Sequence, residues 1–507
     1  MQYGRKEIYT DEKEITKGNI LSVLQKAYAV HLINAKDCEE LIKLDKGEQK
    51  KCRKKIFRKE VDNWVFDNIC NEISSFKINY NWGNSLSFVQ RGEKDTGKAN
   101  EQNAIAIINE YYDSQNIKSK MQQLAYFVEV TGVGYTIVEM NKEWEEGESP
   151  FTINMLDPQT TFVVRSSYYT DHRIVLGVTY RKDSKGVKHY TCFTKEDRYE
   201  IERLSPMTST IPTEGWGKIV NHQSNLIGKM PITEYIRDYD RMGCFERQIE
   251  EIKGISLLVS DFLNGVEQNI NAVFWGNDID FYKDENGNII TPKNGEWLIT
   301  KSTHEGRQPK VEPITMDYNY SGLLEQISFR TSRVKEKCNT PLVTGAANNS
   351  TGIAVSDSSG WTNAEQEANR QDLIKYGSKN EELKVVLAVC KNTEIAKVPE
   401  SVKMLNAKDA MATINRQKNY EMSVKTTALA NMLSHGIYGL HALTAVNMFE
   451  DVNQVWNDSK DLIEMYQKSL FSGNEEEKAT TTDGGREAQI GNSPRIDGMS
   501  KETPKES

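Results

Sequence analysis

The segment from residue 241 to residue 340 constrains the fold most, because it predicts two long helices joined by a β-rich insert. Between Arg241 and Asn269, apolar side chains recur every three or four residues, which is typical of one continuous helix about 45 Å long. Residues 271–320 then carry strand-like runs and an Asn-Gly turn, which favours a hairpin. A helical pattern returns over residues 321–340. This order predicts an antiparallel helix pair with a β-rich tip.

The first 240 residues predict an α+β arrangement. Helical spacing of apolar residues covers residues 15–75 and 100–131, with Val61, Trp64 and Ile69 among its members. Strand-like alternation begins at Tyr135 and recurs between residues 151 and 201, where Asp183-Ser184-Lys185-Gly186 has the composition of a hairpin turn. Helices followed by a meander of strands place this region in the α+β class.

Beyond the returning helix, the sequence predicts a loop, more helices and a disordered tail. Residues 341–360 contain three glycines and many small polar side chains, and a loop of this length is usually functional or disordered. Thr362 and Glu365 form a capping-box pattern that opens a long helix over residues 361–395. Helical patterns continue over residues 396–472, including the stretch MLNAKDAMATINRQ. From residue 473 to residue 507 the composition is polar and lacks aromatic residues, which predicts disorder.

Composition limits the partners and the compartment. The 507-residue chain carries a net charge of −9, so any contact with DNA should be weak or sliding, because tight DNA binding needs a basic surface. The basic run from Lys50 to Lys59 is interpreted as a solvated helix face, with a phosphate or partner contact as the alternative. No transmembrane segment or apolar signal segment is expected. Seven scattered cysteines without a CxxC pair indicate reduced thiols in a cytoplasm.

No catalytic, cofactor-binding or metal-binding residues are expected. The stretch from Gly92 to Lys98 matches a phosphate-binding loop, but Ala99 stands where a magnesium-binding hydroxyl is required. Asp284, Asn286 and Asn288 hint at a calcium loop that lacks its glycine. The histidines are isolated, and no nucleophile or zinc motif is present. The hypothesis that the chain is a nucleotide-dependent enzyme using the Gly92 loop is therefore the least favoured.

Over roughly residues 55–470, the chain resembles the portal proteins of tailed bacteriophages, in the SPP1-like portal family. The resemblance rests on the order and spacing of several segments. They comprise a helix and strand near the start, a helix pair ending in a Gly-Val-Gly-Tyr turn, an LDP and FVV segment, a link into the long helix, and a small-residue signature. These segments are Val61 to Tyr80, Ile105 to Met140, Leu156 to Val164, Pro231 to Glu246 and Asn349 to Ala354.

The resemblance implies an architecture and a function. Residues 1–240 and the long helix 361–395 would form a wing, 241–270 and 321–340 a two-helix stem, 271–320 a β-rich clip, 341–360 a tunnel loop and 396–472 a helical crown. Such portals are dodecameric rings at one capsid vertex, assembled in the host cytoplasm, and serve as the channel for DNA packaging and ejection. The large terminase docks first and head–tail connectors follow, while the major capsid and scaffolding proteins surround the ring. Packaging ATPase activity belongs to the terminase.

The resemblance also points to candidate residues. Small, uncharged side chains of the loop are expected nearest the sliding DNA, namely Thr344, Asn348, Asn349, Ser350, Thr351 and Ser356. The returning helix carries basic residues that either form positive rings in the channel or pair with acidic groups of the adjacent subunit, namely Arg330, Arg333, Lys335 and Lys337. The wing–stem link is expected at Arg241, Gly243, Phe245 and Glu246. The main alternative is another head–tail assembly protein, such as an adaptor or scaffold-associated protein, without a DNA channel.

Overall fold

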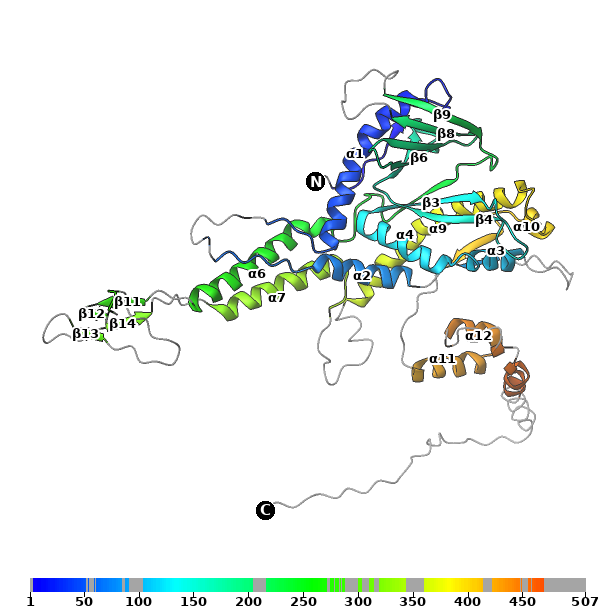
Figure 1. Cartoon of the computed structure of the whole chain (residues 1–507). Coiled ribbons are helices and arrows are strands. Elements are labelled where there is room, and N and C mark those ends of the chain that lie inside the picture. Colours follow the sequence, from blue (N-terminus) through cyan, green and yellow to red (C-terminus); the bar gives the residue numbers. More distant parts are fainter. Residues whose placement is uncertain are drawn as a thin grey trace, which may run out of the picture. The chain divides into compact units, whose positions relative to one another are not determined.

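The computed structural model comprises two compact units, Met1–Arg416 and Gln417–Ser507, and each is described by itself. Figure 1 shows the elements along the chain. The structure describes the chain except for residues 1–2, 52, 54–58, 60, 84–86, 91–103, 204–215, 271–273, 278, 282, 284, 288–299, 303–309, 314–318, 343–359, 414–421, 447, 449–454, 457 and 469–507. The predicted tunnel-loop residues, the Gly92 loop and the predicted disordered tail lie outside the described residues.

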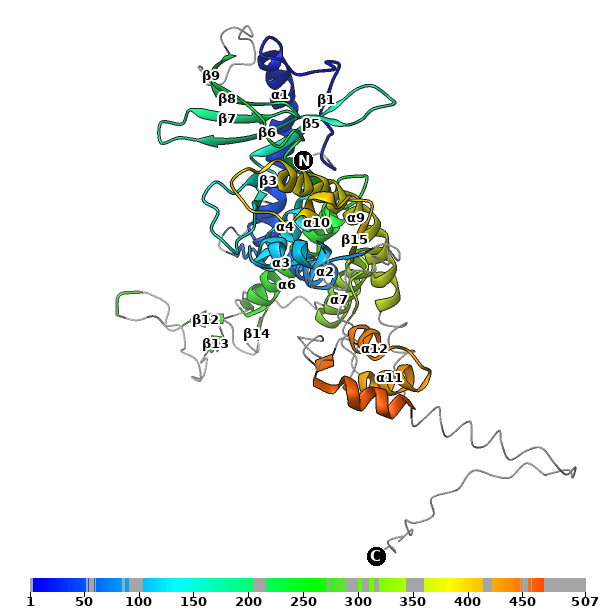
Figure 2. The same ribbon diagram turned by 90° about the vertical axis from the view of Figure 1, so that its right-hand side faces the viewer.

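A six-stranded sheet and helix α1 (Ile20–Asp45) form the first layer of the larger unit (Figures 1 and 2). The strand order is β1-β5-β6-β7-β8-β9, and β1 runs parallel to β5 while the other neighbours are antiparallel. These strands span Tyr9–Thr10, Thr161–Ser166, Ile174–Lys182, Lys188–Phe193, Asp197–Arg203 and Gly217–Ser224. The predicted turn at Asp183–Gly186 is confirmed, because the Gly186 amide donates to the Asp183 carbonyl at 3.0 Å and Gly186 has a φ of +80°.

A three-stranded sheet forms the second layer, in the order β10-β3-β4. Its strands are Ile232–Ile236, Val133–Met140 and Phe151–Leu156. Helices α3 (Ala104–Asp113), α4 (Ile117–Thr131), α9 (Trp361–Asn392) and α10 (Glu400–Met404) share a core with this sheet. The mixed α+β class predicted from the sequence is therefore confirmed.

Strand β15 (Ala410–Thr413) corrects one predicted helix. The sequence predicted a helix through MLNAKDAMATINRQ, but β15 pairs antiparallel with β2 (Ser87–Gln90). Ala410 and Ala412 are buried while Met411 between them is exposed, which is the alternation of a strand. The larger unit therefore extends to Arg416, so the beginning of the predicted crown, residues 396–472, belongs to it.

Helices α6 (Ile249–Ile270) and α7 (Tyr320–Lys337) form the predicted antiparallel pair (Figure 1). Tyr320 at the start of α7 lies near the end of α6, with its hydroxyl 3.4 Å from the Gly265 carbonyl oxygen. The predicted start of the first helix at Arg241 is wrong, because the helical conformation begins with a 3₁₀ turn at Glu246–Gln248. Arg241 has a φ of +55°, which a right-handed helix does not allow.

The segment between α6 and α7 contains short strands, which confirms its β character. Strand β11 (Phe274–Asn277) pairs with β14 (Lys310–Pro313), and β12 (Ile279–Phe281) pairs with β13 (Thr300–Ser302). The return arm of the hairpin predicted at the Asn-Gly turn lies outside the described residues.

Residues 61–68 are not helical, contrary to the prediction. They lie along α6, where Ser260 and Asn264 hold the backbone: the Val65 amide donates to Ser260 Oγ at 3.0 Å, and the Asn63 amide donates to Asn264 Oδ1 at 2.7 Å. We call residues 61–68 the strap. Helix α2 (Ile69–Trp82) begins after Asn68 and continues where the resemblance placed a strand.

Two smaller predictions are also wrong. Lys51 and Arg53 of the basic run are not helical, and they form ion pairs with Asp62 and Asp261. Helix α9 begins at Trp361 after Gly360, which has a φ of +83°, so Thr362 lies inside the first turn and is not the N-cap of a capping box.

The smaller unit contains helices α11 (Met422–Ser434) and α12 (Gly439–Val446) and a helical stretch over residues 458–468. Tyr438 and Trp456 pack with ring centroids 4.9 Å apart, and the Gln467 amide donates to the Ile437 carbonyl at 2.8 Å. These contacts fasten the last helical stretch to the α11–α12 pair.

Candidate functional site

The strongest candidate site is the junction, which we define as residues 237–248 between strand β10 and helix α6. Its backbone passes very close to the end of α4. A Cβ atom on Gly132 would lie 2.5 Å from the Arg241 carbonyl oxygen, and one on Gly243 would lie 2.1 Å from the Val130 carbonyl oxygen. Only glycine fits at these two positions, so the path of the chain into α6 is fixed by steric contact.

Glu234 anchors the start of the junction from strand β10. Its carboxylate is buried and accepts hydrogen bonds from both terminal nitrogens of Arg241, and from Arg165 Nη2 at 2.6 Å. Burial by itself raises the pKa of the Glu234 carboxyl, but the Arg241 and Arg165 guanidinium groups outweigh burial and lower that pKa to about 2. This carboxyl therefore remains ionised in the folded protein over the whole physiological pH range.

Glu246 anchors the other end of the junction. Its Oε1 atom accepts from the Gly4 amide at 2.8 Å and from Arg5 Nη2 at 2.5 Å, while its Oε2 atom accepts from the Gly243 amide at 2.8 Å. Both the Arg5 and Glu246 side chains are buried. A carboxylate at this end also suits the positive end of the α6 dipole. Glu246 thus joins the chain's N-terminal segment to the beginning of α6.

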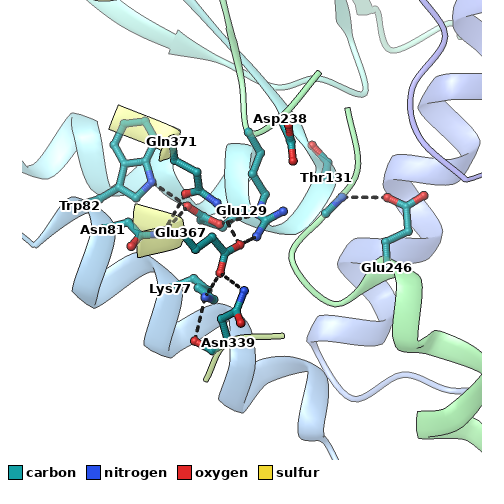
Figure 3. A network of polar contacts seen from close by, with 12 residues as sticks. Lys77, Asn81, Trp82, Glu129, Thr131, Asp238, Glu246, Asn339, Glu367 and Gln371 are labelled. Carbon is teal, nitrogen blue, oxygen red and sulfur yellow. Dashed lines mark hydrogen bonds and ion pairs between the residues drawn. The ribbon is translucent and has the colours of Figure 1, made fainter. Parts of the chain in front are cut away.

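A second ionic network extends from the junction to four helices (Figure 3). Arg237 Nε donates to Glu129 of α4 at 3.0 Å, and its guanidinium also pairs with Glu367 of α9. Glu367 accepts from Lys77 of α2 at 2.5 Å and from Asn339, just after α7, at 3.2 Å. Because these charges are buried and paired, removing any one of them would leave an uncompensated charge in the interior.

Helix α2 contacts both ends of the segment predicted to be the tunnel loop. At its beginning, Lys77 Nζ donates to the Asn339 carbonyl at 3.0 Å. At its end, Trp361 packs edge-on against Phe76 and Tyr80, with ring centroids 5.8 and 5.7 Å apart. Both ends of the loop are therefore anchored on helix α2. The predicted DNA-facing residues Thr344, Asn348, Asn349, Ser350, Thr351 and Ser356 lie outside the described residues.

The four basic residues predicted on the returning helix fall into two pairs. Arg330 binds Glu251 of α6 at 2.7 Å, and Lys335 binds Glu72 of α2 at 2.6 Å. Arg333 and Lys337 are exposed and form no ion pair within the described part of the chain. Only these last two keep their charge available for a contact outside the chain.

The predicted link residues Arg241, Gly243, Phe245 and Glu246 all lie in the junction and are buried. The sequence alone did not indicate Arg5, which is the partner of Glu246, nor the charged residues of the second network, which are Lys77, Glu129, Arg237 and Glu367. One available signal was a charged residue inside an apolar stretch, as with Lys77 four residues after Ile73 and Glu129 within YFVEVT. A charge in a buried stripe implies a buried counter-charge.

The chemical groups at the site are arranged for structural roles. The described cysteines are buried, and burial raises the pKa of the Cys338 thiol to about 11, which makes it a poor nucleophile. Among the described residues, no cluster of His, Cys, Asp and Glu could hold a metal ion. Within that same part of the chain, no helix has the length and apolar character needed to span a bilayer.

Buried ion pairs connect the α+β body to the helix pair, an arrangement that suits a structural protein. Residues 31–424, most of the chain, match the family described as "Phage portal protein, SPP1 Gp6-like", and the chain belongs to this family. The resemblance noted from the sequence is thereby confirmed. Membership implies a non-enzymatic protein of the virion capsid that works within an oligomeric assembly. No curated protein matches the chain.

Proposed function

We propose that the chain is the subunit of a portal ring, a dodecamer at one capsid vertex through which DNA is packaged and ejected. The observation that carries this proposal is the family match, which spans the junction, both helices of the pair and the β-rich segment between them. In this assignment residues 1–240 and 361–395 form the wing, α6 and α7 the stem, residues 271–320 the clip, 341–360 the tunnel loop and the C-terminal helices the crown.

The distribution of charge supports a channel in which DNA slides. The chain is acidic overall, with a net charge of −9, so a ring of it would repel a DNA duplex over most of its surface. Arg333 and Lys337 are exposed on α7 without ion pairs in the described part of the chain. Repeated around a ring, they would give two narrow bands of positive charge. Such bands attract phosphates without a sequence preference and without a continuous basic track that would hold the DNA.

The proposed partners follow from the same assignment. The β-rich clip is the docking platform for the large terminase during packaging and for head–tail connectors afterwards. The wing faces the major capsid and scaffolding proteins. The junction supports these roles mechanically, because it fixes the direction in which α6 leaves the α+β body through buried ion pairs.

The channel role is tested by reversing the two exposed charges. The double variant Arg333→Glu and Lys337→Glu should assemble normally but protect less DNA from nuclease in a packaging reaction with the capsid and terminase. The control Lys118→Glu and Lys142→Glu makes the same charge change at exposed positions of the α+β body and should package normally. Equal packaging by both double variants would contradict the channel role of α7.

The loop assignment is tested separately by deleting residues 348–352. Because both ends of the loop are anchored on α2, the deletion should leave the rest of the fold and ring assembly intact. DNA filling should nevertheless be impaired. Normal filling of capsids that contain this variant would remove the loop from the DNA path.

A further inference from the structure

A groove in the larger unit is not explained by the portal assignment. It has a volume of about 1240 Å³ and lies between one end of the six-stranded sheet, strand β10 and helix α9. Its floor is apolar and includes Ile174, Met230 and Ile232. At its rim, Leu373 is 73% exposed and Tyr239 is 82% exposed. Large apolar side chains exposed beside an apolar floor are typical of a surface that binds a partner.

The α9 wall of the groove has a notch at Gly377. A Cβ atom placed on Gly377 would meet no atom within 4 Å, so the space above this residue is open. Leu373 and Lys384 lie on the same wall, about 16 Å apart along the helix axis. A glycine flanked by larger side chains lets a second helix approach α9 closely, because side chains of one helix pack into the grooves of another.

The charges around the groove differ from those of the whole chain. Seven basic and five acidic residues line it, on a chain whose net charge is −9. Four of the lysines, Lys13, Lys17, Lys195 and Lys229, form no ion pair in the part of the chain that the structure describes. Two of the acidic residues are already compensated, Glu234 by Arg165 and Glu381 by Lys384. Glu14, Glu196 and Asp197 are the other acidic residues of the lining, which therefore carries a net charge of +2 where the whole chain carries −9.

We propose that this groove binds an amphipathic helix with acidic flanks, supplied by another protein. The apolar stripe of such a helix would cover the floor and the exposed Leu373, while its carboxylates would face the unpaired lysines. The notch at Gly377 would allow the close contact. A helix of about three turns matches the length of the α9 wall. The inference rests on groove shape and charge and does not depend on ring assembly or on the DNA channel.

The probe is a fluorescein-labelled helical peptide of about 18 residues, with leucine at helical spacing and glutamate elsewhere. Fluorescence anisotropy with the full-length chain should give a dissociation constant on the order of 10 µM, weakening as salt is raised. A matched peptide with lysine in place of glutamate should bind at least about tenfold more weakly, because its charges meet the same lysines. Equal binding of both peptides would overturn the proposal.

Gly377→Trp tests whether the peptide binds in this groove. Because the space is open, the tryptophan should fill the notch, leave thermal unfolding unchanged and lower peptide affinity at least about tenfold. Gly254→Trp on α6 is the matched control, since a Cβ at Gly254 also meets nothing within 4 Å, and it should bind like the wild-type protein. Wild-type affinity in Gly377→Trp would overturn the proposal. So would a loss of self-assembly in Gly377→Trp alone, because the occupant would then be a second copy of this chain.

Discussion

Helices α6 and α7 form one antiparallel pair, yet the chain covers them very differently. On α6, the apolar residues Ile249, Ile252 and Ile255 are buried, and so are the polar residues Ser256, Ser260 and Asn264. On α7, Val334 is the buried residue among those described, while Leu324 is 50% exposed and Phe329 is 60% exposed. The junction and the strap therefore fasten α6 to its own chain, whereas most of the described α7 side chains are not buried.

The buried residues of α6 stabilise the subunit, whereas the exposed residues of α7 remain available for contacts outside it. The exposed face of α7 carries Phe329 and, four residues later, Arg333, which places both side chains on one side of the helix. Its apolar area has no covering partner within the described chain. In the proposed ring, α6 would transmit force to the α+β body, and α7 would supply the contacts outside the subunit.

The largest expected effect on stability comes from removing the Glu246 carboxylate, which holds the beginning of α6. Glu246→Gln leaves the buried Arg5 guanidinium without its carboxylate, which should cost about 3–5 kcal/mol in the free energy of unfolding. Glu250→Gln, one turn later on α6, is the control, because the Glu250 side chain is 73% exposed and its loss should cost less than about 0.5 kcal/mol. Urea unfolding followed by tryptophan fluorescence measures both. Equal effects would show that the junction does not hold α6.

A second break removes the close backbone contact at Gly132. Gly132→Ala combines a positive φ with a clash against the Arg241 carbonyl, so it should destabilise the chain by about 3 kcal/mol or more. Gly186→Ala measures the cost of the positive φ alone, since Gly186 also has a positive φ but open space around its Cβ position. It should cost only about 1–2 kcal/mol. The steric account of the junction fails if the two variants have the same melting temperature.

Low pH should weaken the attachment of the junction before α6, because Glu234 becomes protonated. The pKa of this carboxyl falls from its ordinary value of 4.5 to about 2 in the folded chain, so its contribution is complete above pH 4.5 and is lost as the pH falls toward 2. The contribution amounts to about 3 kcal/mol. The stability difference between wild type and Glu234→Gln should therefore narrow over this pH range. Glu325→Gln, at an exposed position of α7, is the control, and a stability difference for Glu234→Gln that stays constant with pH would refute the assignment.

The smallest effect on folding is expected on the free face of α7. Phe329→Ser should change the free energy of unfolding by less than about 0.5 kcal/mol, because the side chain is mostly exposed. Because Phe329 shares its side of the helix with Arg333, which is proposed to face the hole, the variant should also assemble like the wild-type protein in sedimentation velocity. Ile327→Ser is the contrasting variant, since Ile327 packs against the core around the start of α6 and its loss should cost about 2 kcal/mol. A large folding defect in Phe329→Ser would show that this face is not free.

Periodicity predicted the parts of the fold that depend on local sequence. The helix pair, the strands between residues 151 and 201 and the Asp183 turn follow from the spacing of apolar residues and from turn chemistry. The strap was misread as a helix because Val61, Trp64 and Val65 have helical spacing. Its conformation is set by Ser260 and Asn264, about 200 residues away, whose side chains bond its backbone.

The candidate site could be predicted only in part for the same reason. The link from Arg241 to Glu246 was predicted from the resemblance to portal proteins, as one continuous segment. The buried charges of the second network are scattered along the chain, and Lys77 and Glu367 are 290 residues apart in the sequence. A single sequence shows that Lys77 and Glu129 interrupt apolar stretches, but the pairing of buried charges is decided by the tertiary fold.

Ring formation can be examined in a three-dimensional electron-microscopy reconstruction of the full-length chain, produced together with the capsid and scaffolding proteins. We expect a closed ring of about twelve copies around a continuous hole, with α6 packed within its own subunit and Arg333 and Lys337 of α7 directed toward the hole. An assembly without a continuous hole, or only monomers and dimers under these conditions, would contradict the proposal that this portal-family chain forms a DNA channel.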